Sequence, residues 1–320
     1  MRLTDEQIRS VTAGALRVER REDGLHFYKC TEKQTEAWSA LSSGLGQRSL
    51  TTTGIRLDFH TDSRHLSFVA PSGNKFEVYV DNVLRAQFDC EALSREEKPA
   101  ELDLTDALGG ETEQVRVTLI FPSHGVGVLD YVELDDGSAV TPHKFDRKIL
   151  FMGDSITQGW DTVYDSLSYA WRVTRFFNAE SVIQGVGGAY FHETLVDVSD
   201  FDPDTVVIAF GTNDFGHYHT QEELRAHTSA FLRAIVRAYG DKKIYVISPI
   251  WREAKQKTMG TFREARAVIV EEIEKLGLCH IDGLSLVPPM PVFFKDATLH
   301  PDDLGFSLYA ENLIRQMLER

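Results

Sequence analysis

The stretch Lys148–Gly159, KILFMGDSITQG, decides the fold of the second half of the chain. Its first six residues, KILFMG, form an apolar run of the kind that makes a buried strand. Ser155 follows shortly after that predicted strand ends. Four more runs of this type come later: SVIQGV from Ser181, TVVIAFG from Thr205, KIYVISPI from Lys243 and LCHID from Leu278. Helical patterns lie between or after them, at 165–178, 220–239, 258–276 and 302–319. This alternation of strand and helix predicts a parallel sheet covered on both faces.

Chemically useful residues follow several of these predicted strands. Ser155 follows the first strand, a glycine cluster at 185–188 ends the second, and GTND at 211–214 ends the third. Far downstream, DATLHP places His300 just before the last helix. Open α/β sheets carry their sites at the carboxyl edge of the strands, so we expect these features to converge there. Each alone would be read as a cap, a turn or a surface residue, and only their conjunction predicts a site.

Together these four features resemble the blocks of the GDSL or SGNH hydrolase family: a GDS serine, a glycine, a GxND asparagine and a histidine followed by proline. The resemblance covers roughly residues 147–320. It implies a flavodoxin-like three-layer α/β/α domain that works as a carboxylic ester hydrolase. It also implies that no cofactor is required.

The resemblance gives each block a role. Ser155 is the nucleophile, and His300 is the base that takes its proton and later returns it to the leaving alcohol. The oxyanion would be bound by the backbone N–H of Ser155, the backbone N–H of Gly188 and the side-chain amide of Asn213. In the family the oxyanion glycine usually lies five positions after an asparagine, and here that position holds Ile183. Gly188 stays the expected donor. The glycines at 185 and 187 are expected to allow a tight turn and the close approach of neighbouring backbone.

The aspartate that would pair with the catalytic histidine is a second departure from the family pattern. Most members carry an aspartate three residues before the histidine, where this chain has Ala297, and Asp296 lies four residues before. An irregular loop can absorb one extra residue, so Asp296 is expected to orient His300. The alternative is a Ser–His dyad in which a backbone carbonyl does that work. Asp302 and Asp303 are expected to cap the last helix.

Further residues at the same edge are candidates for substrate binding. They are Asp154, Tyr190, His217 and Trp251. Core packing explains an aromatic at such positions about as well, and Asp154 and Asp214 are also expected to hold their loops together. His217 and His219 have the spacing of a metal pair, but no third ligand is obvious, so no metal is predicted.

The first part of the chain reads mostly as strands. The segments are LHFYKC from Leu25, TGIRLDFHTD from Thr53, HLSFVA from His65, KFEVYVD from Lys75, VLRAQFD from Val83, QVRVTLIF from Gln114 and VLDYVEL from Val128. Alternation at period two and a hairpin signal at Asp81–Asn82 predict an all-β, jelly-roll-like sandwich over residues 1–143, followed by the hydrolase domain over 144–320. A short helix at Thr4–Ala13, with Thr4 and Gln7 as a capping box, is expected before the strands.

Composition excludes several classes of function. The 320 residues carry a formal net charge of −15 without a long basic run, which argues against nucleic acid and anionic membrane surfaces as partners. No apolar stretch approaches the roughly 18 residues of a membrane helix, and the start MRLTDEQIRS lacks the features of a secretory signal, so a cytoplasmic protein is expected. The widely spaced Cys30, Cys90 and Cys279 suit buried free thiols.

A β-sandwich before such a hydrolase domain resembles the arrangement of carbohydrate esterases that remove acetyl groups from plant polysaccharides or oligosaccharides. The segment FEVYVDN from Phe76 is similar to the front domain of that group. The leading hypothesis is an acetylesterase of acetyl-xylan or oligosaccharide type that works through an acetyl-Ser155 intermediate on a small-molecule or oligosaccharide ester. The alternatives are a lipase, thioesterase or acyltransferase with the same machinery, and an inactive carbohydrate-binding protein. Exposed sheet edges are compatible with homo-oligomerisation.

Overall fold

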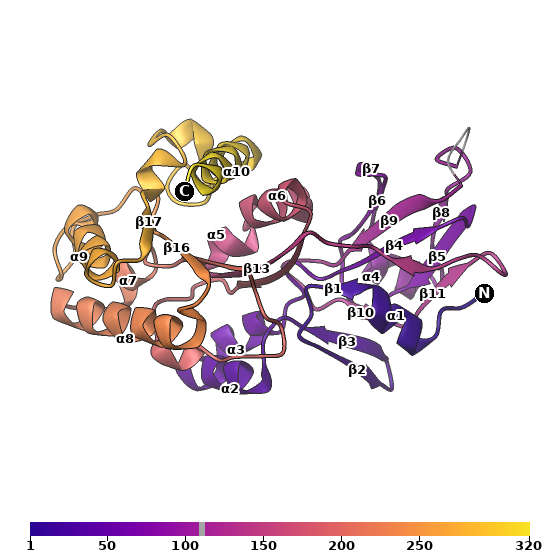
Figure 1. Ribbon diagram of the computed structural model, residues 1–320, viewed down its shortest axis with the longest axis horizontal. Coiled ribbons are helices and arrows are strands. Elements are labelled where there is room, and N and C mark those ends of the chain that lie inside the picture. Colours follow the sequence, from indigo (N-terminus) through magenta and orange to yellow (C-terminus); the bar gives the residue numbers. More distant parts are fainter. Residues whose placement is uncertain (109–112) are drawn as a thin grey trace. The chain divides into compact units, whose positions relative to one another are not determined.

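The computed structural model describes residues 1–108 and 113–320, which form two compact units (Figure 1). The first unit consists of Met1–Cys30 and Leu50–Phe145, and the second of Thr31–Ser49 and Asp146–Arg320. Two differences from the expected domains 1–143 and 144–320 follow. The later boundary lies at 145/146, and Thr31–Ser49 is an excursion from the first unit that belongs to the second.

The second unit is built on one five-stranded parallel sheet. Its strands are β13 (Arg147–Gly153), β14 (Ala179–Gly185), β15 (Thr205–Ala209), β16 (Lys243–Ile247) and β17 (Cys279–Ile281). They lie in the order β14-β13-β15-β16-β17, and every neighbouring pair is parallel. All five predicted strands are therefore present. The order 2-1-3-4-5 reverses between β13 and β15, which is the place where open α/β sheets bind their ligands.

Helices cover this sheet. They are α2 (Glu32–Leu41), α3 (Ser43–Ser49), α5 (Ser155–Gln158), α6 (Tyr169–Phe176), α7 (Asp214–His217), α8 (Gln221–Tyr239), α9 (Phe262–Lys275) and α10 (Asp303–Leu318), with 3-10 turns η1 (Asp165–Leu167), η2 (Glu193–Leu195), η3 (Gly283–Ser285) and η4 (Pro291–Phe293). The chain steps across the sheet in one direction from β13 to β14 and in the opposite direction from β15 to β16 and β17. Because each crossover is right-handed, α6 lies on one face of the sheet and α8 and α9 lie on the other. The α10 helix packs on α6, and α8 packs on α9 (Figure 1).

Side chains fix where these helices begin. The α8 helix has the expected capping box of Thr220 and Glu223, and Asp302 caps α10 by accepting from the Gly305 N–H at 2.7 Å. The pattern expected at 165–178 is split, because Ser168 caps α6 after the 3-10 turn η1. The pattern expected from 258 begins later, since Thr261 forms a capping box with Glu264.

The excursion α2–α3 was not predicted from the sequence. Thr31 and Gln34 form a capping box at the start of α2. The Gln34 amide is buried and forms a reciprocal pair with Gln184 of β14, at 3.0 and 2.9 Å, and it also donates to the Leu195 carbonyl at 2.9 Å. These contacts with residues far along the chain hold the excursion in the second unit.

The first unit consists of antiparallel sheets. Its strands are β1 (Thr12–Ala13), β2 (Arg17–Arg21), β3 (Gly24–Tyr28), β4 (Arg56–Thr61), β5 (His65–Val69), β6 (Phe76–Val80), β7 (Val83–Phe88), β8 (Ala100–Asp103), β9 (Val115–Ile120), β10 (Val128–Leu129), β11 (Tyr131–Leu134) and β12 (Thr141–Pro142). One sheet runs β1-β4-β9-β6-β7 with β12 beside β4, and two three-stranded sheets run β10-β3-β2 and β11-β5-β8. Their apolar side chains share one core. The jelly-roll-like sandwich is compatible with this arrangement and stays a prediction.

Some local features of the first unit were predicted and one was not. Helix α1 (Asp5–Val11) carries the Thr4–Gln7 capping box, and a second helix, α4 (Cys90–Arg95), was not predicted. Asp81 and Asn82, at φ of 49° and 66°, make the tight hairpin between β6 and β7. Among the described residues, Cys30, Cys90 and Cys279 form no disulfide, and Cys279 of the second unit, expected to be buried, is only half-buried. In the described ranges no helix has the length and apolarity needed to cross a membrane.

Candidate active site

Ser155 is the first residue of α5, directly after β13. Asp154 caps this short helix, because its Oδ1 accepts from the Ile156 N–H at 2.9 Å. The helix can start so close to the sheet only because glycines stand there: a Cβ on Gly153 would lie 2.0 Å from the Thr157 hydroxyl, and one on Gly185 2.5 Å from the Gln158 nitrogen. The serine thus sits at the carboxyl edge with its N–H at a helix start, where it has no acceptor within the helix.

The structure brings Ser155, His300 and Asp296 together from distant parts of the chain. The Ser155 Oγ lies 2.9 Å from His300 Nε2, and His300 Nδ1 lies 2.9 Å from Asp296 Oδ2. Ser155 is 7% exposed. A hydroxyl, an imidazole and a carboxylate in this sequence of contacts can activate the serine as a nucleophile. The geometry favours the triad over the dyad that the sequence left open.

A residue in the left-handed backbone conformation accommodates the one extra residue between Asp296 and His300. Ala297 has a φ of 57°, and the turn it makes lets Asp296 Oδ1 accept from the N–H groups of Thr298, Leu299 and His300 at 2.9, 2.7 and 3.1 Å. Burial opposes ionisation of this carboxyl, but the backbone N–H groups and the His300 ring outweigh it and lower the pKa of Asp296 to about 2. The carboxylate therefore stays charged beside His300 at neutral pH.

Two expected oxyanion donors lie on the loops after β14 and β15. Gly188 adopts a φ of +84°, and within the described part of the chain its N–H donates to no acceptor. The Asn213 amide nitrogen donates to the Ala189 carbonyl at 2.9 Å, which fixes the amide and leaves its second hydrogen available. The two donors are thereby tied to one another through the backbone of the Gly188–Ala189 segment.

Two side chains that the sequence analysis did not assign hold the peptide next to Gly188. Gln158 Oε1 accepts from the Gly187 N–H at 2.9 Å, so this N–H is not an oxyanion donor. Arg48, on α3 of the excursion, donates to the Gly187 carbonyl. That carbonyl and the Gly188 N–H belong to the same peptide group. Gln158 could have been found from the GDSITQG block, whereas Arg48 carries no local signal.

Two buried carboxyls lie behind this edge. Burial raises the pKa of Asp154 to about 7, against the Ile156 N–H and the charge of Arg252. Burial also raises the pKa of Asp214 to about 7, against the Phe191 N–H that its Oδ1 accepts at 2.9 Å, and Asp154 adds to the rise. Asp154 is only 2% exposed, so it holds the start of α5 and does not reach outward as the expected substrate-binding residue would.

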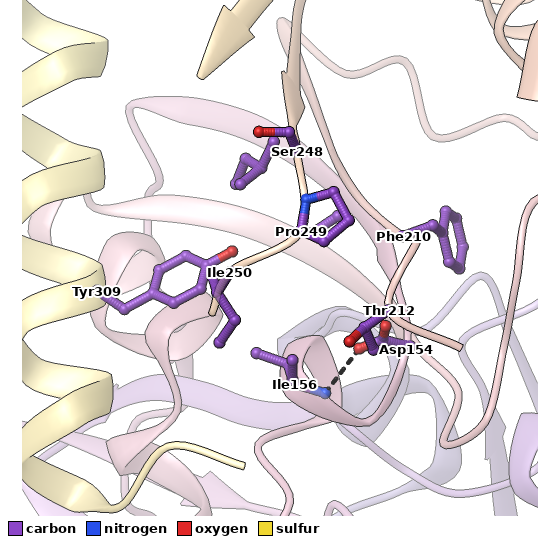
Figure 2. Close-up of a pocket in the computed structure, with 10 residues that line it drawn as sticks. Asp154, Ile156, Phe210, Thr212, Ser248, Pro249, Ile250 and Tyr309 are labelled. Atoms are coloured by element: carbon purple, nitrogen blue, oxygen red, sulfur yellow. Dashed lines mark hydrogen bonds between the residues drawn. The ribbon is translucent and has the colours of Figure 1, made fainter. Parts of the chain in front are cut away.

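A cavity of about 20 Å³ lies beside Asp154 and Ile156, lined also by Thr212, the 247–250 segment and Tyr309. Figure 2 shows the Asp154 carboxylate in this cavity with its hydrogen bond to the Ile156 N–H. The volume is that of about one water molecule. It is too small for an acyl chain, so a substrate must approach Ser155 from elsewhere.

The other expected substrate-binding residues lie apart from the catalytic contacts. The Tyr190 ring is buried and stacks on the exposed His217 ring at 3.6 Å. Trp251 packs on Phe294 at 4.9 Å, and Arg252 donates to the Thr212 carbonyl at 2.8 Å. Among the described residues, no hydrogen bond or ring contact joins Tyr190 or Trp251 to the triad, and their part in substrate binding stays a prediction.

Trp160 is a candidate site residue that the sequence analysis did not name. Its ring lies 6.2 Å from the His300 ring, and it is 40% exposed. Its backbone N–H donates to the Ser155 carbonyl at 2.9 Å, so the GDSITQG block itself carries it to the site. An exposed tryptophan directly after that block is the signal that could have identified it. Among the described residues, one group has the spacing of metal ligands, His192, Glu193 and His227, and it does not include the HYH pair.

Comparisons with known proteins concern the family and the fold. Residues 151–308 match the GDSL-like Lipase/Acylhydrolase family. Among solved structures, the salicylyl-acyltransferase SsfX3 from a tetracycline biosynthetic pathway is 18% identical with a TM-score of 0.81, covering 96% of this chain and 94% of that one. A family two carbohydrate esterase from Cellvibrio japonicus is 16% identical with a TM-score of 0.66, covering 100% and 96%.

A family two carbohydrate esterase from Clostridium thermocellum, solved with cellohexaose, is 18% identical with a TM-score of 0.63, covering 84% and 93%. At these identities the likenesses show a shared fold. The curated proteins that were searched contain no match to the chain.

Proposed function

Residues 151–308 match the GDSL-like lipase/acylhydrolase family, and from that premise we propose that the chain is a serine esterase that removes O-acetyl groups from carbohydrates. The observation that carries the proposal is the Asp296–His300–Ser155 arrangement, with both contacts at 2.9 Å. An inactive carbohydrate-binding protein would have no need of this alignment.

The catalytic cycle follows from the placement of these groups. The Ser155 Oγ attacks the ester carbonyl carbon while His300 Nε2 takes its proton, and the Asp296 carboxylate stabilises the imidazolium. The carbonyl oxygen becomes an oxyanion that accepts from the N–H groups of Ser155 and Gly188 and from the Asn213 amide. The imidazolium then protonates the sugar oxygen as the C–O bond breaks, which leaves an acyl-serine. Water, deprotonated by the same imidazole, releases acetate and restores the serine.

One feature beside the triad supports a sugar alcohol as the leaving group. Trp160 is an exposed aromatic ring next to His300, the residue that protonates the leaving alcohol, and such a ring can stack on a sugar face. The fold shared with family two carbohydrate esterases is compatible with this assignment.

Acyl transfer to an alcohol other than water is a second candidate. The observation in its favour is the TM-score of 0.81 to the salicylyl-acyltransferase, which extends over 96% of this chain. Chemically the two reactions differ only in which hydroxyl attacks the acyl-serine. The fate of the acyl group therefore decides between them.

The test measures hydrolysis of p-nitrophenyl esters from acetyl to octanoyl and acetate release from acetylated xylo-oligosaccharides, with Ser155→Ala as control. We expect activity confined to short acyl groups, acetate release from the sugar, and a loss of at least about 1,000-fold in the variant. Preference for long chains would assign a lipase or thioesterase activity instead. Acyl products on added alcohols in place of free acid would assign transfer, and inactivity on every ester would favour a binding protein.

A further inference from the structure

Three potential metal-binding side chains gather outside the triad. They are His192 and Glu193, on the loop that follows the oxyanion glycine, and His227 on α8. One donor atom from each lies within 4.8 Å of the other two. His227 Nδ1 is 3.9 Å from a Glu193 carboxylate oxygen, and these side chains are 35% and 45% exposed, so an ion could reach them from solvent.

The chemistry of this donor set is selective. Two imidazoles and one carboxylate suit a borderline divalent transition metal such as Zn²⁺, whereas Ca²⁺ and Mg²⁺ prefer oxygen ligands alone. With metal–ligand distances of about 2.0–2.2 Å, tetrahedral donors lie about 3.3 Å apart. The half-exposed Glu193 side chain can close the remaining distance by rotation about its own torsions.

Neighbouring groups already hold the two histidine rings. His192 Nδ1 lies 2.8 Å from the Thr194 hydroxyl, and an N–H donated to that oxygen leaves Nε2 as the free ligand. The Tyr218 ring stacks on His227 with centroids 4.7 Å apart, and the Tyr218 hydroxyl donates to the Phe191 carbonyl at 2.6 Å. One tyrosine thereby links the His227 ring to the backbone next to His192.

We propose that His192, Glu193 and His227 form a site for a divalent transition metal, with Zn²⁺ as the best fit. Three protein ligands leave at least one coordination position for water. The ion would connect α8 to the loop that follows Gly188. The hydrogen bond between Asn213 and Ala189 holds the beginning of that loop, and the ion would hold its end. The site is independent of the proposed esterase activity, since none of its residues belongs to the triad or the oxyanion donors.

The test is isothermal titration of the chelator-treated full chain with Zn²⁺, followed by melting curves with and without the metal. We expect one ion per chain and a higher melting temperature in its presence. His192→Ala and His227→Ala should each weaken binding by at least about tenfold, and Glu193→Gln should weaken it less, because a neutral amide oxygen replaces the carboxylate. His65→Ala, which changes a histidine of the first unit, is the matched control and should bind as the wild type does.

Two further measurements keep the result unambiguous. Titration of the Ser155→Ala protein should give the same affinity, which separates metal binding from the fate of the proposed function. Co²⁺ bound to the wild-type chain should show the visible absorption of a low-symmetry site with nitrogen ligands. Zn²⁺ affinity equal to that of the wild type in His192→Ala, His227→Ala and Glu193→Gln, or Mg²⁺ binding as tight as Zn²⁺, would overturn the proposal.

Discussion

At the scale of the residue, Asp296 does two jobs with its two oxygens. Oδ1 accepts three backbone N–H groups and holds the loop, while Oδ2 faces His300 Nδ1 at 2.9 Å. An alanine would remove both contacts at once and would confuse a loop defect with a catalytic one. Asparagine keeps an oxygen for the loop and places an amide NH₂ against the imidazole, which favours the wrong tautomer of His300.

We therefore predict that Asp296→Asn lowers kcat by at least about 100-fold with little change in the melting temperature. His300→Ala should lower it at least as much. Steady-state kinetics on an acetyl ester and thermal unfolding of the same preparations check this. A loss of less than about tenfold in Asp296→Asn, beside a large loss in His300→Ala, would restore the dyad.

Arg48 is a positioning residue at the same scale. Its guanidinium donates to the Gly187 carbonyl, and that peptide group also carries the Gly188 N–H expected to bind the oxyanion. A cation on the carbonyl orients the peptide plane and makes its N–H a stronger donor. Because the oxyanion forms only during the reaction, the effect belongs to the transition state and not to substrate binding.

Arg48→Met should therefore lower kcat by about 10-fold and leave KM nearly unchanged, which is less than the roughly 100-fold expected for loss of a whole donor. Arg48→Lys should recover part of the rate, since it keeps the charge without the guanidinium geometry. Lys33→Met, on the neighbouring helix of the excursion, serves as the control. An unchanged kcat in Arg48→Met, or a change confined to KM, would refute the positioning role.

At the scale of the element, α5 and α7 both begin with a buried carboxyl. Asp154 caps α5, Asp214 opens α7, and burial raises the pKa of both to about 7 from the ordinary 3.8. Between about pH 4 and about pH 7 these two carboxyls bind more protons in the folded state than in the unfolded state. The free energy of unfolding should therefore fall as pH rises from about 4 to about 7 and change little above that.

Asp214→Asn should remove one part of this pH dependence, because the amide keeps an oxygen for the Phe191 N–H and cannot ionise. Relative to wild type, the free energy of unfolding of the variant should rise as pH increases from about 4 to about 7, by on the order of 1.4 kcal/mol for each pH unit. Urea unfolding across that range measures it, with the exposed Asp200→Asn as control. Parallel curves for variant and wild type would mean that Asp214 titrates normally in the folded state.

The helices and strands also show which features could be predicted from the sequence. The five parallel strands and the helices after them were predicted because apolar periodicity and caps such as Thr220 are local signals. Ser155, His300 and Asn213 could be placed at one edge because they follow strands or precede a helix. The triad could not be separated from a dyad, since the left-handed turn at Ala297 that brings Asp296 to the imidazole is not written in residue type. Trp160 was missed because its nearness to His300 depends on the fold.

At the scale of the whole molecule, one short excursion supplies the second unit with a group that its own continuous sequence lacks. The α2–α3 segment lies between strands of the first unit in the sequence, and it brings Arg48 to the Gly187 carbonyl. Its strand-rich surroundings and polar composition hid it from sequence analysis. The stabilising contacts come from Gln184 and Leu195, about 150 residues later in the chain.

The buried amide pair of Gln34 and Gln184 should therefore control the attachment of the excursion. Gln34→Met or Gln184→Met breaks the hydrogen bonds between these two buried amides, at a cost of about 1–3 kcal/mol in the free energy of unfolding. The double variant should cost less than the sum of the two, because both single substitutions break the same pair. Urea unfolding of the four proteins gives this double-mutant cycle, and kcat should fall with the single substitutions as Arg48 loses its support. Additive losses would show that the pair is not coupled and that α2–α3 is held mainly by its other contacts.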